Sequence, residues 1–306
     1  MINGIISVIV IFLIFSVGFW FTYRKIWPES TTSVLSVIVV KIGAPALAIY
    51  SISDRFTQEL LRASVLHLFI LLLYTLLLFF TGKVFSKIMH LKEGKKSVFE
   101  VTFTFSNTIF IGLPINEIVF GHDGLPYLFT FYLITLTTFW SLGAYELAKA
   151  SPLEAKGFSL RRLFSPGLIG VLIGFALVQF NWSIPLVFDS ALRYLGALCV
   201  PLSLLVIGAN LVVFAKGIPR ITKDEFIILV GKFIISPIYM FILLHLFHVE
   251  GLAFQVFMLT STMPCHMQTS ILAEFYNVES EYASKLVSLS TLICLVTIPI
   301  YVALFR

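Results

Sequence analysis

Charged residues are scarce in this chain. They make up 12% of its 306 residues, whereas soluble domains usually carry roughly 25%. Hydrophobic residues make up 58%, and the mean hydropathy is +0.99. A water-soluble core of this chain length could not hide so many apolar side chains, so the sequence predicts a protein whose solvent is lipid.

Cysteine is also rare, and its three positions exclude two kinds of site. Cys199, Cys265 and Cys294 all fall inside apolar segments. Their spacing fits neither a disulfide framework nor a zinc site. We therefore interpret them as small packing residues and expect no metal.

Several motifs of energy coupling and catalysis are missing. The sequence has no glycine-rich loop that could cradle a phosphate, and no loop long enough for an ATPase domain. It has no adjacent aspartate pair in an apolar segment, which argues against a dedicated cation/proton antiporter. It also lacks a serine–histidine arrangement with a nucleophile turn, so an enzyme is disfavoured. We expect no cofactor, only a coupling ion such as a proton or sodium.

What the chain does contain is a series of ten apolar runs, most of them near the roughly 20 residues that a membrane-spanning helix needs. Together they predict an all-α integral membrane protein. The predicted spans are 2–22, 31–53, 64–86, 98–120, 126–149, 166–182, 187–214, 225–248, 251–275 and 281–305.

Basic residues are concentrated in alternate loops between these runs. If the N-terminus lies outside, the outer loops and the outer C-terminus hold only three basic residues, Arg55, Arg62 and Arg306. The other basic residues between the spans then lie in the inner loops. This bias predicts a multi-pass protein of the cell (inner or plasma) membrane with both termini extracytoplasmic. Because the basic residues lie between spans, membrane lipid is the expected partner and nucleic acid is not.

Ten spans divide into two sets of five, residues 1–150 and 151–306. An odd number of helices forces the second set to insert upside down relative to the first. Such inverted repeats are common in secondary transporters. We therefore predict a 5+5 inverted repeat.

Prolines in the second and fourth spans, Pro45 and Pro114, have counterparts in the seventh and ninth, Pro201 and Pro264. Pro237 and Pro299 have no partners, so the match between the halves is partial. Polar residues surround Pro114 and Pro264. In the fourth span Asn107, Thr108 and Gly112 precede Pro114. In the ninth span His266 and Gln268 follow Pro264. Proline removes a backbone donor and opens the helix, and such backbone persists at membrane depth only where protein or a wet cavity surrounds it. Two opened helices would form a site for a small anion.

Three segments resemble the auxin efflux carrier family, which includes plant auxin carriers and bacterial malate and malonate permeases. Residues 107–114, NTIFIGLP, resemble its fourth-helix motif. Residues 263–276, MPCHMQTSILAEFY, resemble its ninth-helix motif, and residues 201–211, PLSLLVIGANL, its seventh helix. The ten-segment layout agrees as well, so the resemblance covers essentially the whole chain.

The resemblance implies a scaffold domain and a transport domain, each drawn from both halves. It implies that helices 4 and 9 cross at Pro114 and Pro264. The implied activity is elevator-like alternating access for small carboxylates such as malate or malonate, and the implied assembly is a homodimer.

Some polar residues near the breaks are candidates for substrate contact. The Asn107 amide can donate to a carboxylate without carrying charge, and Asn210 is similar by its place in the resembling motif. Gln268 is a weaker candidate. His266 could contact the anion or carry a coupling proton, although a lone histidine in a helix is more often a packing residue.

Embedded charges form a second group of candidates. Lys41 falls near the middle of the second span, where an ammonium costs roughly 2.5–3.5 kcal/mol on insertion scales, so it could serve the substrate or simply snorkel. Lys232 lies close enough to the cytoplasmic end of the eighth span that we expect it to snorkel. Glu117 is a second candidate for proton coupling.

Other functions remain open at this point. The same architecture could carry another substrate class, such as an amino acid or a sterol-like anion, and the pocket volume would discriminate them. A membrane ligand sensor is a further alternative, although short loops leave little surface for a signalling partner.

Overall fold

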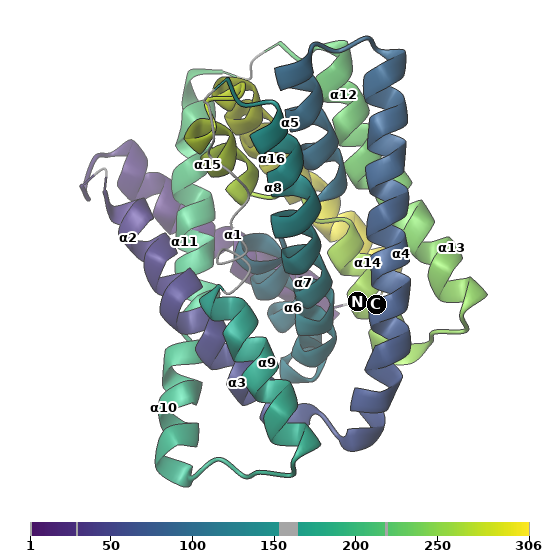
Figure 1. Cartoon of the computed structure of the whole chain (residues 1–306). Coiled ribbons are helices and arrows are strands. Elements are labelled where there is room, and N and C mark those ends of the chain that lie inside the picture. Colours follow the sequence, from purple (N-terminus) through teal and green to yellow (C-terminus); the bar gives the residue numbers. More distant parts are fainter. Residues whose placement is uncertain (1, 29, 153–164, 218–219, 306) are drawn as a thin grey trace.

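The computed structural model describes residues 2–28, 30–152, 165–217 and 220–305. Within these ranges the chain is helical, and its single extended pairing is an isolated β-bridge (Figure 1). The predicted all-helical class is confirmed.

The first half of the chain holds twelve helical elements in five apolar stretches. Short π-helical or 3₁₀ turns (η) interrupt several of these stretches. In chain order the elements are α1 (Ile2–Tyr23), α2 (Thr31–Ile38), η1 (Val39–Gly43), α3 (Ala44–Arg55), α4 (Gln58–Ile88), α5 (Glu93–Thr104), η2 (Thr108–Gly112), α6 (Leu113–Phe120), η3 (His122–Gly124), α7 (Leu125–Thr138), η4 (Phe139–Gly143) and α8 (Ala144–Lys149).

The described part of the second half holds ten helical elements. Its elements are α9 (Pro166–Gln179), α10 (Leu186–Gly196), α11 (Cys199–Asn210), η6 (Leu211–Lys216), α12 (Lys223–Val230), η7 (Gly231–Ile235), α13 (Ser236–Leu246), α14 (Gly251–Ser261), α15 (Gln268–Phe275) and α16 (Ser280–Phe305).

Within the described ranges, six helical stretches are long and apolar enough to cross a membrane. They are Thr31–Arg55, Leu60–Ile88, His122–Lys149, Leu186–Ala215, Lys223–Leu246 and Ser280–Phe305. Shorter apolar helices cover Ile9–Tyr23, Thr108–Phe120, Pro166–Gln179 and Gly251–Ser261. Every run that the sequence predicts as a span is therefore helical along most of its length.

Three of the prolines inside these stretches directly follow π-helical turns. Pro45, Pro114 and Pro237 each stand in the first two positions of the helix that follows η1, η2 and η7 respectively. Proline is tolerated there because the first turn of a helix does not need its missing N–H. Pro299, in contrast, lies inside α16.

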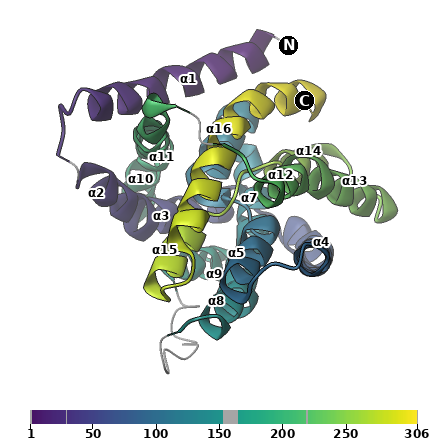
Figure 2. The same cartoon turned by 90° about the horizontal axis from the view of Figure 1, so that it is seen from above.

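The helices form two packed groups; in Figure 2, α1, α3 and α11 lie at one side of the bundle and α4, α13 and α14 at the other. In the first group α1 packs along α11, and α3 packs along α9 and α10. In the second, α4 packs on α5 and α7, α13 packs on α4 and α14, and α15 packs on α16. We call these the α1/α11 group and the α4/α14 group.

Ion pairs cluster at one end of the α4/α14 group, at the top of Figure 1, where α5 and α12 begin and α8 ends. Lys83 pairs with Glu146 at 2.5 Å, Lys95 with Asp224 at 2.9 Å, and Lys285 with Glu225 at 2.7 Å. The basic ends of these helices therefore gather on one side of the bundle. This grouping agrees with the loop charges, while the orientation in a membrane stays a prediction.

The contact between α1 and α11 generates a test of the packing. A Cβ built on Gly208 would collide with the backbone carbonyl of Phe15. Backbone cannot rotate away as a side chain can, so we expect Gly208→Ala to lower the free energy of unfolding by about 1–3 kcal/mol. Thermal unfolding in detergent measures the change. The control is Gly82→Ala in α4, whose added Cβ would lie 3.4 Å from the nearest atom, a Phe103 side-chain carbon. Equal stability of the two variants would contradict the close approach.

Candidate functional site at the helix crossover

Two helices unwind in the middle of the bundle and cross there. Helix α5 ends at Thr104 and η2 begins at Thr108, while α14 ends at Ser261 and α15 begins at Gln268. The Asn107 N–H donates to the Pro264 carbonyl at 2.8 Å, and the His266 N–H donates to the Phe105 carbonyl at 3.1 Å. Ser106 and Cys265 form an antiparallel bridge between these bonds.

This pairing satisfies backbone groups that the helices have released. A buried amide or carbonyl without a partner costs free energy, and the cost is highest away from water. Three further groups brace the crossing. The Ser290 hydroxyl accepts from the Cys265 N–H at 3.1 Å, Ser236 Oγ donates to the Ser261 carbonyl at 2.6 Å, and Lys232 Nζ donates to Ser106 Oγ at 3.1 Å.

The structure corrects two expectations about these residues. The crossing in the fourth segment lies at Ser106, and Pro114 is in the first turn of α6, because the first turn of a helix does not need the N–H that proline lacks. Pro264 does lie in the crossing. Lys232 does not snorkel: its side chain is fully buried, since it bonds to Ser106 instead of reaching the helix end.

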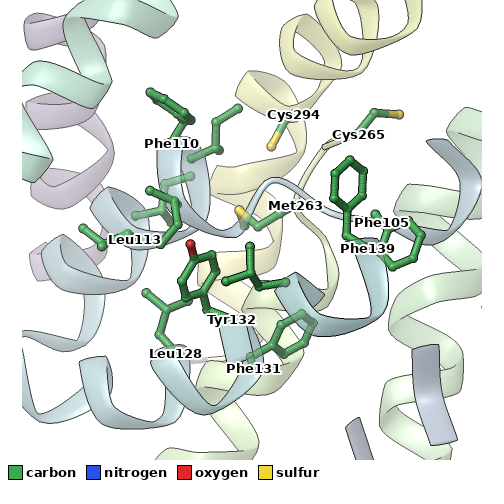
Figure 3. Packing of buried hydrophobic residues seen from close by; sticks show 14 of the residues in the cluster. Phe105, Phe110, Leu113, Leu128, Phe131, Tyr132, Phe139, Met263, Cys265 and Cys294 are labelled. Atoms are coloured by element: carbon green, nitrogen blue, oxygen red, sulfur yellow. The ribbon is translucent and has the colours of Figure 1, made fainter. Parts of the chain in front are cut away.

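Apolar side chains fill the space around the crossing (Figure 3). Met263 lies at the centre, with Leu113 on one side and Phe139 on the other, and all three are fully buried. On this side the crossing is packed against apolar side chains, and a hydrogen bond is stronger in such a low-dielectric surrounding.

A cavity of about 230 Å³ opens beside the crossing. Its walls come from η2, from the end of α11, and from α15 and α16, so both helix groups contribute. Two carboxamides and four hydroxyls supply its polar lining: Asn107, Asn210, Ser270, Ser284, Ser288 and Thr291. The structure thus brings together Asn107 and Asn210, which are far apart in sequence.

Asn107 is fixed by its own helix. Its Oδ1 accepts from the Phe110 N–H at 3.2 Å and caps η2, as asparagine does at helix starts. The side chain is 3% exposed. With the oxygen engaged in the cap, the NH₂ group is left to donate into the cavity.

A second cavity of about 10 Å³ lies next to the first, and Asn107, Phe110 and Met267 line both. His266 and Gln268 also line it. In the described part of the chain, both ring nitrogens of His266 and the Gln268 Oε1 are buried without a hydrogen-bond partner. The volume is about that of one water, which could satisfy these atoms.

Other predicted site residues lie outside the two cavities. Thr108 is buried with its hydroxyl 3.5 Å from the Ser106 carbonyl, and the Gly112 N–H donates to the Asn107 carbonyl, so both shape η2. Lys41 is exposed on η1. Glu117 is half-buried on α6, 3.8 Å from the His122 ring. Neither Lys41 nor Glu117 lines either of these two cavities.

The lining residues of α16 were missed at the sequence level. Ser284, Ser288 and Thr291 repeat at intervals of four and three residues, which places them on one face of a helix. A search of the predicted spans for polar residues at helical spacing would have found them.

Comparison with known proteins agrees with these features. A family model described as membrane transport protein matches residues 3–302. An uncharacterized transporter of Methanothermobacter thermautotrophicus is 26% identical over 306 residues, covering 97% of this chain and 96% of the relative. An uncharacterized transporter of Methanocaldococcus jannaschii is 25% identical over 301 residues, covering 96% of each.

The brace on the crossing yields a test. Ser290→Ala leaves the buried Cys265 N–H without its acceptor, so we expect a loss of about 1–3 kcal/mol in unfolding free energy. Thermal unfolding in detergent measures it. In the matched control, Ser53→Ala, the hydroxyl bonds only to carbonyls of its own helix, and a change within about 0.5 kcal/mol is expected. If the Ser290→Ala protein is as stable as this control, Ser290 does not stabilise the crossing.

Proposed function

The chain belongs to the membrane transport proteins of the auxin efflux carrier family, because the family model matches nearly its whole length. From this premise we propose that it is a secondary transporter or facilitator for small organic acid anions such as malate or malonate. The observation that carries the proposal is the cavity beside the crossing, whose lining includes both Asn107 and Asn210.

The chemistry of the lining supports a small carboxylate. Amide and hydroxyl groups donate to a carboxylate in charge-assisted hydrogen bonds, and none of the described residues that line the cavity is acidic. The volume, about 230 Å³, falls below the range of roughly 300–1,000 Å³ of pockets for drug-sized ligands. It therefore favours a short organic acid over a sterol-like anion.

The architecture supports an alternating-access mechanism. We propose that the helical stretches span the membrane as two inverted five-helix halves, 1–150 and 151–306. The α1/α11 group would be the scaffold and the α4/α14 group the transport domain, each drawn from both halves. Asn210 lies on the first group and Asn107 on the second, so sliding of one group past the other would open the cavity on alternate sides.

Orientation and coupling are part of the same proposal. The end that carries the ion-paired lysines would face the cytoplasm, with both termini outside a cell membrane, and a homodimer would form as in the resembling family. Ser284 and Ser288 lie in the first turns of α16, at that end, so the cavity would be open inward. His266 and Glu117 remain candidates for a coupling proton.

Uptake into vesicles is the direct test. Purified protein in liposomes is expected to accumulate labelled malate or malonate faster than protein-free liposomes. Separate preparations carry an imposed proton gradient, a sodium gradient or a membrane potential. Absence of uptake for every mono- and dicarboxylate tried, under all three conditions, would refute the proposed function.

Substitution of Asn107 separates its two roles. Asn107→Asp keeps an oxygen to cap η2 but replaces the donor NH₂ with a negative charge, so the protein is expected to fold and to lose anion binding. Asn107→Ala removes the donor and the cap, and we expect binding to weaken about 10–100-fold, as for a hydrogen bond to a charged group.

Binding is measured as the rise in unfolding temperature with added malonate, because a ligand of the folded state raises apparent stability. The control is Gln179→Ala, an exposed amide at the end of α9, which should bind like the wild type. Unchanged binding in Asn107→Asp would exclude this residue from the site.

A further inference from the structure

Lys232 is a buried lysine without a carboxylate partner. It lies on η7, its side chain is 0% exposed, and Ser106 Oγ is its hydrogen-bond partner, at 3.1 Å. None of the ion pairs in the described part of the chain includes it. An ammonium in such a place is costly, so a purely structural role leaves its presence unexplained.

The fold holds this side chain against the crossing. A Cβ built on the preceding residue, Gly231, would collide with the Phe103 ring on α5, so η7 and α5 are in close contact. The Tyr301 hydroxyl donates to the Phe233 carbonyl on the same turn. Because η7 is anchored by α5 on one side and by α16 on another, the Lys232 ammonium has a fixed position.

That position is next to the carbonyl end of a helix. Helix α5 ends at Thr104, two residues before Ser106. The C-terminal end of a helix carries partial negative charge, and in secondary transporters such ends, with unwound carbonyls, are where coupling cations bind. In this chain a tethered ammonium already lies at this end.

The same position is directly behind the wall of the anion cavity. Ser106 and Asn107 are neighbours at the crossing, where the chain is extended at Phe105 and paired at Ser106, and successive side chains of extended chain point to opposite sides. Ser106 faces Lys232 and Asn107 faces the cavity. Among the described residues, no lysine, arginine or histidine lines the larger cavity itself.

We propose that Lys232 is a tethered counter-cation of the anion site, which supplies at the crossing the positive charge that a coupling sodium would otherwise bring. The inference rests on the proposed transport of organic anions and narrows it, because it predicts uptake that does not require sodium. Lys232 acts through Ser106 and the crossing, so it is a positioning residue and does not touch the substrate.

The first test separates charge from structure. Lys232→Met keeps an unbranched side chain and removes the buried ammonium. We expect its unfolding temperature without ligand to equal or exceed that of the wild type, because the desolvation cost is gone. Malonate binding, read from the ligand-induced rise in unfolding temperature, should weaken about tenfold or more, because a nearby unit charge in a low-dielectric site is lost.

The control is Lys87→Met, on an exposed lysine in the last turn of α4, which should leave both readings unchanged. Wild-type malonate affinity in Lys232→Met would overturn the inference. A marked fall in its unfolding temperature together with lost binding would also overturn it, in favour of a structural lysine.

The second test needs no variant and holds even if Lys232→Met fails to fold. Wild-type vesicles are assayed for malonate uptake with sodium and with choline in its place. Equal rates are expected, and a strict sodium requirement would overturn the inference. Failure of the wild type to take up any organic acid in either salt would instead count against the proposed function.

Discussion

Unwound backbone in the middle of an apolar bundle must find partners within the protein, and this requirement governs the centre of the structure. The segments after α5 and α14 meet this requirement because their backbones hydrogen-bond to each other, through Asn107 with Pro264 and Phe105 with His266. The pairing draws two helices from opposite halves into one rigid unit. The cavity lies beside this unit, with residues of η2, α11, α15 and α16 in its walls. Without the paired segments, the released amides would carry the full cost of desolvation.

The same requirement explains the polar side chains around the crossing. Ser290, Ser236 and Lys232 come from α16, α13 and η7, and each contributes a hydrogen bond to the crossing or to the helix end beside it. Serine suits this role because it offers a donor and an acceptor with little volume. Lysine is the exception, since its charge is costly in the same place. A residue that opposes stability and is nevertheless rigidly held is the kind of feature for which a functional explanation is needed.

Hydropathy was sufficient to predict the helices, and much less of the site could be predicted. The apolar runs are helical as expected, because a chain in lipid has to satisfy its backbone within each span. The crossing at Pro264 was also predicted, since proline removes a local bond. Its counterpart at Ser106 was not, because that break depends on the Asn107 cap and on pairing with a segment far away in sequence. Lys232 was wrongly expected to reach the helix end for the same reason: only the tertiary structure supplies the Ser106 hydroxyl.

Rigidity of the crossing also bears on how a transport cycle could operate. A paired and braced backbone cannot open without losing several buried hydrogen bonds, so in the proposed cycle the crossing would move as one body with Asn107 and Lys232 at fixed separation. The change would then occur where the two helix groups meet, between η2 and α11, at the wall that carries Asn210. An anion held by Asn107 would keep its counter-charge throughout the movement. The charge of the site would thus be compensated on both sides of the membrane, which is the condition for carrying an anion through an apolar barrier at low cost.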